Sequence, residues 1–224
     1  MDTPHIPIAL QATFPNVYEP AEDSFLLLDA LEKDLPGQSF FQSDDNPPLV
    51  LEVCCGSGIV ATALANFSPL AKIIPLVFTV DVNPDACFMT AKVAAHNCAQ
   101  FKVESVVGNG VSLSTLFRTP FDIIVCNPPY VPVVEGEHDE DKLSGTLEKS
   151  WSGGVDGNSF ITPFLESVAS ALSSSGVLYL LLSSWNRPED LVKQMYKHCG
   201  LKGHRIIYRK TGPEHLTVWR FSRP

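Results

Sequence analysis

The chain has 224 residues, of which 45% are hydrophobic and 18% are charged, and its formal net charge is -9. This length and apolar fraction predict one globular domain with a single well-filled core. The acidic balance repels polyphosphate, which argues against nucleic acid held mainly by charge, and the longest apolar run, 177–182, is too short to span a membrane.

The six cysteines form no Cys-x-x-Cys pair, and most lie in apolar runs, where cysteine behaves as a small hydrophobic residue. We therefore expect no metal site in this chain. The first fifteen residues also lack the cationic start and continuous apolar stretch of a secretory signal. Together these features predict a soluble intracellular protein of a reducing compartment, which we expect in the cytoplasm, with the nucleus as an alternative.

The N-terminal residues 1–17 are rich in proline and show no clear periodicity, so we expect a flexible arm followed by a single domain at 18–224. Pro20 suits a first helical turn, and the acidic residues at 22–23 suit the positive end of the helix dipole. Apolar residues at helical spacing then predict an amphipathic helix through Leu35.

An apolar run at 49–54 passes directly into the turn Gly56-Ser57-Gly58 and a helix-like segment at 59–67. A strand, a glycine turn and a helix open a nucleotide-binding α/β unit, in which glycines let a ligand approach backbone N–H groups. The third glycine of the dinucleotide fingerprint is missing. We therefore expect a ligand with a carboxylate in place of a pyrophosphate.

Two further predicted strands end in polar residues. The run 73–80 ends at Asp81, 23 residues after Gly58, which is where such folds hold a ribose by its hydroxyl groups. The strand 101–107 is followed by Gly108-Asn109-Gly110, which brings Asn109 within reach of the same ligand. Both positions therefore predict contacts with one nucleoside.

The fourth predicted strand, 121–126, leads into Asn127-Pro128-Pro129-Tyr130. Proline has no N–H and restricts the residue before it, so the strand must end in a stiff turn. The Asn127 side-chain oxygen and the Pro128 carbonyl can converge on one planar NH2 group, and Tyr130 can lie against its flat face. The turn therefore predicts binding of an amide or an exocyclic amine.

The acidic segment 131–150 allows two interpretations, a solvated loop or a substrate lid over the neighbouring turn. The remaining patterns predict helices at 85–96, 159–172 and 188–198 and strands at 176–183, 204–208 and 216–221. Alternating strands and helices predict a mostly parallel sheet covered on both faces, with an antiparallel final pair.

Five motifs occur in one order: Tyr18-Glu19-Pro20-Ala21-Glu22-Asp23, Leu51-Glu52-Val53 before the glycine turn, Asp81-Val82-Asn83-Pro84, Asn127 to Tyr130, and Gly153-Gly154-Val155-Asp156-Gly157. In this order they resemble the HemK family of class I S-adenosylmethionine-dependent methyltransferases, which methylate a glutamine of translation release factors, and specifically its eukaryotic and archaeal branch. The match runs from Tyr18 to nearly the end of the chain. It implies a Rossmann-like fold with a seven-stranded, mostly parallel sheet, an antiparallel last strand and helices on both faces.

The resemblance also implies roles for individual residues. Around S-adenosylmethionine it places Ser24, Glu52, Cys54, Gly56, Gly58, Asp81, Asn109, Gly110 and Asn127. It places the substrate amide on Asn127, Pro128, Pro129 and Tyr130, of which Asn127, Pro128 and Tyr130 are catalytic. Two positions depart from the family, because Cys54 replaces the first glycine of the turn and Asn109 replaces an aspartate beside the adenine.

The implied reaction is methyl transfer to the glutamine of the Gly-Gly-Gln motif in a class I release factor. Asn127 and Pro128 would orient the amide, Tyr130 would stack on it, and no dedicated general base is expected. The resemblance also implies a heterodimer with a small zinc-binding activator protein, which adds a strand beside 101–107.

Three alternatives stay open from the sequence. The same tetrapeptide serves adenine methyltransferases that modify the exocyclic amine of a flipped base, and lysine is a further acceptor proposed within this branch. The third alternative is a non-catalytic partner that binds S-adenosylmethionine without transferring the methyl group. The acidic charge and the lack of a basic patch interleaved with aromatic residues argue against nucleic acid.

Overall fold

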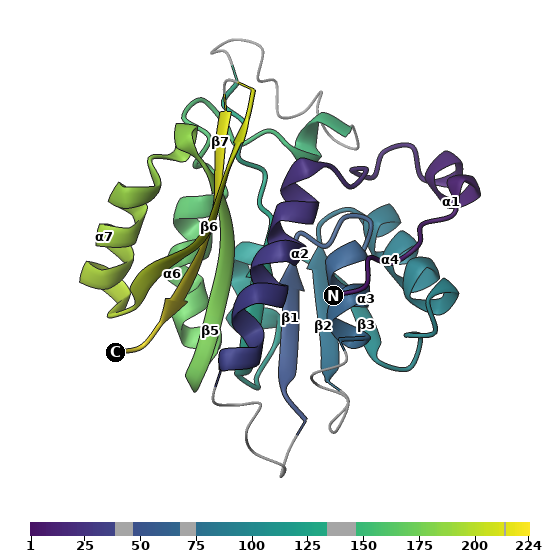
Figure 1. The fold of residues 1–224 in the computed structure, drawn as a ribbon, viewed down its shortest axis with the longest axis horizontal. Helices are drawn as coiled ribbons and strands as arrows, with labels where there is room; N and C mark the ends of the chain where they lie inside the picture. The colour runs from purple at the N-terminus through teal and green to yellow at the C-terminus, as the bar shows by residue number, and fades with distance from the viewer. Residues whose placement is uncertain (39–46, 68–74, 134–146, 213) are drawn as a thin grey trace.

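A computed structural model describes residues 1–38, 47–67, 75–133, 147–212 and 214–224 (Figure 1). Its strands are β1 (Leu49–Val53), β2 (Leu76–Asp81), β3 (Val103–Val107), β4 (Phe121–Cys126), β5 (Leu172–Ser183), β6 (Lys202–Thr211) and β7 (Glu214–Ser222). They form one seven-stranded sheet in the order β3-β2-β1-β4-β5-β7-β6. The first five run parallel, and β7 is antiparallel to both of its neighbours, which confirms the predicted sheet.

The helices are α1 (Ile8–Thr13), α2 (Glu22–Asp34), α3 (Ile59–Ala65), α4 (Pro84–His96), α5 (Leu113–Leu116), α6 (Ile161–Ala171) and α7 (Pro188–Cys199). One layer contains α2, α3 and α4, and the other contains α6 and α7 (Figure 1), with α5 packed against α6. Within the described residues, no helix is long and apolar enough to cross a membrane.

The central strands form the core because both of their faces are covered. The side chains of β4 from Ile123 to Cys126 and of β5 from Leu178 to Leu182 are fully buried. Parallel strands covered on both faces carry continuous apolar runs of this kind. At the margin of the sheet, the strand expected at 101–107 begins only at Val103, and Phe101 lies ahead of it with 90% of its surface exposed.

The N-terminal residues 1–17 are not the aperiodic segment that we expected. Ile6, Leu10 and Phe14 recur every four residues and pack against Val17 and α4. The backbone N–H of His5 donates to Asn97 Oδ1 at 2.9 Å, which ties the segment to the end of α4. Pro7 between these residues, and the prolines at 4 and 15 on either side of them, hid the helical spacing. Whether the segment is flexible in solution stays a prediction.

Helix α2 is fixed to the sheet through its last residue. Tyr179 donates its hydroxyl proton to Asp34 at 2.6 Å, and Arg220 pairs with the same carboxylate at 2.9 Å. Its apolar side faces inward through Leu27 and Leu31, which are fully buried, whereas Phe25 stays 38% exposed. This attachment holds the N-terminal turn of α2 beside the carboxyl ends of the strands.

Candidate active site

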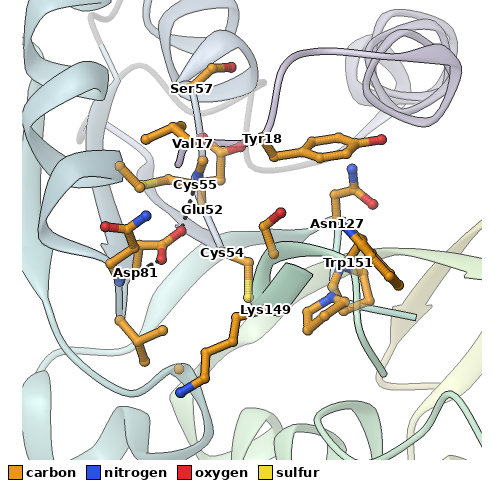
Figure 2. Close-up of a pocket in the computed structure, with 18 of the residues that line it drawn as sticks. Val17, Tyr18, Glu52, Cys54, Cys55, Ser57, Asp81, Asn127, Lys149 and Trp151 are labelled. Atoms are coloured by element: carbon orange, nitrogen blue, oxygen red, sulfur yellow. Dashed lines mark hydrogen bonds between the residues drawn. The ribbon is translucent and has the colours of Figure 1, made fainter. Parts of the chain in front are cut away.

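A cavity of about 470 Å³ opens at the carboxyl ends of β1, β2 and β4. The chain order of the sheet reverses between β1 and β4, and open α/β sheets bind ligands at such a switch point. The predicted residues on the cavity wall are Ser24, Glu52, Cys54, Gly56, Asp81, Asn109, Gly110, Asn127, Pro128, Pro129 and Tyr130. In Figure 2, Asp81 and Glu52 lie on one side of Cys54, and Asn127 lies on the other. The wall thus has a nucleoside half and an amide half.

The nucleoside half is organised by Asp81 at the end of β2. Its Oδ2 accepts a hydrogen bond from the backbone N–H of Gly56 at 3.1 Å, and its Oδ1 accepts one from Asn83 N–H at 2.9 Å. Burial raises the pKa of the Asp81 carboxyl above its ordinary value, and these N–H groups oppose the shift. Gly56 has a φ of +49°, and a Cβ there would meet no atom within 4 Å. A ligand can therefore approach the backbone at Gly56 directly.

Glu52 lies beneath the glycine turn with 3% of its surface exposed. Its Oε2 accepts a hydrogen bond from Ala61 N–H at 2.8 Å. Desolvation by burial raises the pKa of this carboxyl from 4.5 to about 8. A cationic group that entered the cavity would favour the ionised carboxylate, so Glu52 suits the ammonium of an amino-acid ligand.

Cys54 and Gly58 flank the turn and differ in their relation to the cavity. Cys54 lines it with a φ of +60°, a conformation that costs a residue with a Cβ roughly 1 to 2 kcal/mol. Gly58 is the predicted cofactor residue that the structure does not place on the wall. A Cβ at Gly58 would lie 2.7 Å from the Cα of Thr90, so this glycine permits close packing of α3 against α4.

Asn109 and Gly110 line the cavity after β3. The Asn109 side chain accepts a hydrogen bond from Val111 N–H at 3.1 Å and so caps the short turn that follows. A Cβ at Gly110 would lie 2.4 Å from Cγ1 of Val53, so only glycine fits beside the end of β1. The prediction that Asn109 contacts an adenine stays a prediction.

The amide half contains Asn127, whose side chain is divided between two environments. Its Nδ2 donates to Asp23 Oδ2 at 3.1 Å. Its Oδ1 is buried and has no hydrogen-bond partner among the residues that the structure describes. A buried acceptor without a partner destabilises the folded protein, because its desolvation is not offset by a hydrogen bond. The Asn127 oxygen therefore indicates that a bound ligand supplies an N–H or O–H donor at this position.

Asp23 is the functional residue that our sequence reasoning missed, since we assigned it only to a helical first turn. Its side chain is 4% exposed, and it also accepts hydrogen bonds from Tyr18 at 3.1 Å and Tyr130 at 3.3 Å. Burial first, and the charge of Asp23 second, raise the pKa values of both tyrosines well above their ordinary range. The Tyr130 hydroxyl is therefore held by the protein, and stacking of its ring on a substrate stays a prediction.

The late glycine motif supports the segment after Tyr130. Asn186 is 1% exposed, and its Nδ2 donates to the carbonyls of Tyr130 at 3.1 Å and Gly157 at 2.9 Å. A Cβ at Gly157 would lie 2.5 Å from the Tyr130 carbonyl oxygen. In the same segment, the backbone N–H of Val131 donates to the Trp151 carbonyl at 2.9 Å, and Trp151 lines the cavity, where sequence reasoning had not placed it. The central part of the possible lid, 134–146, lies outside the described residues.

The cysteines belong, with histidine, aspartate and glutamate, to the side chains that can bind metals. All six cysteines are free. Across the described ranges, no three His, Cys, Asp or Glu side chains are grouped so that they could hold a metal ion.

Comparison with known proteins gives a consistent result. Residues 23–144 match the methyltransferase small domain family. The chain is 35% identical to Methyltransferase HEMK2 of Mus musculus over the full length of both chains. It is 32% identical to the eRF1 methyltransferase catalytic subunit mtq2 of Schizosaccharomyces pombe, with 94% of this chain and 90% of that protein covered.

Two solved structures show the same fold. One is the E. cuniculi Mtq2-Trm112 complex, which is responsible for the methylation of the eRF1 translation termination factor. A chain of that complex matches with a TM-score of 0.58 at 20% identity, and the match covers 93% of this chain and 99% of that chain. A T. thermophilus 16S rRNA methyltransferase in complex with AdoMet and guanosine matches with a TM-score of 0.58 at 19% identity, with 92% and 44% covered.

Proposed function

The chain belongs to the HemK family of S-adenosylmethionine-dependent glutamine methyltransferases, in its eukaryotic branch, and we propose that it methylates the glutamine of the Gly-Gly-Gln motif in a class I release factor. The acceptor atom is the side-chain amide nitrogen. The observation that carries this proposal is the buried Oδ1 of Asn127 at the cavity, which has no hydrogen-bond partner among the described residues. A primary amide supplies the N–H donor that this oxygen lacks.

The cavity wall fits S-adenosylmethionine. Asp81 offers carboxylate oxygens to the ribose hydroxyls, Gly56 leaves the backbone accessible, and Glu52 offers a buried carboxyl to the methionine ammonium. The bound cofactor supplies a methyl group on a sulfonium, which is an activated electrophile. The protein therefore has to orient the acceptor nitrogen and exclude water.

An amide nitrogen is a poor nucleophile because its lone pair is delocalised into the carbonyl. In our proposal the two N–H groups of the substrate donate to Asn127 Oδ1 and the Pro128 carbonyl, which fixes the amide plane and returns electron density to nitrogen. Such alignment can contribute up to roughly 7 to 11 kcal/mol to a transfer reaction. The surplus proton then leaves through these oxygens or to solvent.

The experiment is a radiolabelled methyl-transfer assay with the activator protein present. Wild type and Asn127→Ala would be compared on a release factor with its Gly-Gly-Gln motif intact and on one with the glutamine changed to asparagine. An adenine-containing oligonucleotide would serve as competitor. Asn66→Ala, an exposed change at the end of α3, is the matched control. Calorimetric titration with S-adenosylhomocysteine would verify that each variant still binds cofactor.

We expect label on the intact release factor only, lost in Asn127→Ala and retained in Asn66→Ala. Label on the oligonucleotide would replace this proposal with adenine methylation. Label that survives the glutamine change and maps to a lysine would replace it with lysine methylation. Cofactor binding without any transfer would leave a non-catalytic binding protein.

We further propose that the chain forms a heterodimer with a small zinc-binding activator protein along β3. Among the described strands β3 pairs only with β2, so its outer edge offers unpaired backbone groups. Exposed apolar side chains surround this edge, with Phe101 exposed by 90%, Phe88 by 63% and Val107 by 53%. The solved Mtq2-Trm112 complex supports a partner of this kind.

Charged substitutions at the two edges of the sheet test this interface. Phe88→Glu and Phe101→Glu should reduce co-purification with the activator and lower the soluble yield. Tyr208→Glu, at a position 49% exposed on β6 at the opposite edge, is the control and should leave both unchanged. Equal loss in all three variants would contradict docking at β3.

The six free cysteines support our placement of the heterodimer in the cytoplasm or the nucleus.

A further inference from the structure

We propose that Asp23 is a positioning residue that fixes the direction of the Asn127 amide and thereby makes the site select an NH2 group over a carboxylate. This inference rests on the proposed glutamine substrate and names what allows the site to distinguish glutamine from glutamate. It assigns to Asp23 a role beyond that of an acidic residue in the first turn of a helix.

The contacts of Asp23 are divided between its two oxygens. Oδ1 accepts from the Ser24 backbone N–H at 2.6 Å and from Ser24 Oγ at 3.3 Å. Oδ2 accepts from Asn127 Nδ2 and from the hydroxyls of Tyr18 and Tyr130. These three donors come from the N-terminal segment and from the turn after β4, 104 residues away in the case of Asn127. The carboxylate therefore joins α2 to the proposed amide-binding turn.

An ionised carboxylate can only accept hydrogen bonds, whereas an amide has one donor side and one acceptor side. Only the NH2 of Asn127 can therefore face Asp23, and its Oδ1 must face away. Both tyrosine hydroxyls already donate to the same oxygen of Asp23, and burial raises their pKa values, so neither hydroxyl becomes a competing anion near neutral pH. The direction of the Asn127 amide thus follows from the charge of Asp23.

The fixed direction has a consequence for specificity. A glutamine amide brings N–H donors to Asn127 Oδ1. A glutamate carboxylate brings only acceptors, and it meets both this oxygen and the charge of Asp23. If residue 23 were neutral and could donate, the Asn127 amide could turn over and present its NH2 to a carboxylate or a carbonyl. The site would then lose its preference for the amide.

A reciprocal exchange tests this role. The variants are Asp23→Asn, Asn127→Asp and the double exchange, all measured as complexes with the activator. In the double variant an amide at 23 can donate to a carboxylate at 127, which again presents an acceptor to the substrate. Asp29→Asn is the matched control, since it makes the same change on α2 at a carboxylate that pairs with Arg209 away from the cavity. The readouts are kcat and KM for the release factor, inhibition by its Gln→Glu form, and the dissociation constant of S-adenosylhomocysteine.

We expect Asp23→Asn to lower kcat by about 10- to 100-fold and to strengthen inhibition by the Gln→Glu form, with cofactor affinity changed less than about threefold. Asn127→Asp should lower kcat further. The double exchange should have a kcat about tenfold higher than that of Asn127→Asp alone. A kcat within about twofold of wild type in Asp23→Asn, or a double variant no better than Asn127→Asp, would overturn the inference. If wild type itself fails to label glutamine, the proposed function fails; the role of Asp23 is then decided by the same exchange with the acceptor that is labelled.

Discussion

Asp81 Oδ2 accepts the backbone N–H of Gly56 at 3.1 Å, so the end of β2 is tied directly to the glycine turn that follows β1. One carboxylate therefore orders the turn and faces the cavity in which we place the ribose. Binding of a nucleoside at this position and the local order of the backbone are coupled through the same side chain.

The first prediction concerns this carboxylate. Asp81→Ala removes both the acceptor for Gly56 and the proposed ribose contact, so the dissociation constant of S-adenosylhomocysteine should rise about 100-fold, measured by calorimetry. Asp85→Ala, four residues further on at a residue that does not itself line the cavity, is the control. Equal affinities in the two variants would show that Asp81 does not hold the cofactor.

The second prediction concerns pH. The pKa of Glu52 is raised to about 8 by burial, so the folded protein binds a proton here that the unfolded chain releases above 4.5. The stabilising contribution is complete below 4.5, and it falls by up to about 1.4 kcal/mol per pH unit until the pH passes the folded pKa. Glu52→Gln should lack this slope. Its free energy of unfolding in urea should therefore increase relative to that of wild type as the pH rises toward 8. Parallel curves for the two proteins would contradict the assignment, and the exposed Glu104→Gln is the control.

The third prediction separates two roles of Tyr130. Tyr130→Phe removes only the hydroxyl that donates to Asp23 at 3.3 Å, whereas Tyr130→Ala also removes the ring. If the ring stacks on the substrate amide, kcat should fall less than about tenfold in the first variant and about 100-fold in the second. Equal losses in both variants would assign the role of Tyr130 to its hydroxyl.

The strand ends were predictable from the sequence because the relevant signals are local. An apolar run followed by glycine, aspartate or proline marks both a strand and the residue that it carries to the cavity, as at Asp81 and Asn127. The departures at Cys54 and Asn109 were visible from the resemblance to the family pattern, and the structure places both on the wall.

Contacts between distant segments could not be derived in this way. Asp23 meets Asn127 across 104 residues, and nothing in its local sequence distinguishes it from Glu22, which is exposed. The packing role of Gly58 could not be derived either, because its limiting neighbour, Thr90, belongs to another helix, and its predicted contact with the cofactor stays a prediction. Packing between elements, which short patterns do not record, decided each of these positions.

The fourth prediction concerns the support of the amide half. Asn186→Ala would leave the Tyr130 and Gly157 carbonyls and the Ser183 N–H without their present partner in a buried region. The free energy of unfolding should fall by about 2 to 4 kcal/mol, as measured in urea. Asn16→Ala, at an exposed residue whose side chain makes no hydrogen bond within the described residues, should change it by less than about 0.5 kcal/mol. A small effect of Asn186→Ala would show that water replaces the amide at this position.

The last prediction compares the two glycines of the turn. Both have positive φ, but a Cβ at Gly56 meets open space, whereas a Cβ at Gly58 meets the backbone of Thr90 at 2.7 Å. Gly56→Ala should therefore cost only about 1 to 2 kcal/mol of stability, and it should weaken cofactor binding because the methyl group enters the space of the ligand. Gly58→Ala should cost more than about 3 kcal/mol, because α3 and α4 must separate to accept it. Urea unfolding and calorimetric titration of both variants decide the matter. A stable Gly58→Ala protein with weakened cofactor binding would instead support the predicted contact of Gly58 with the cofactor.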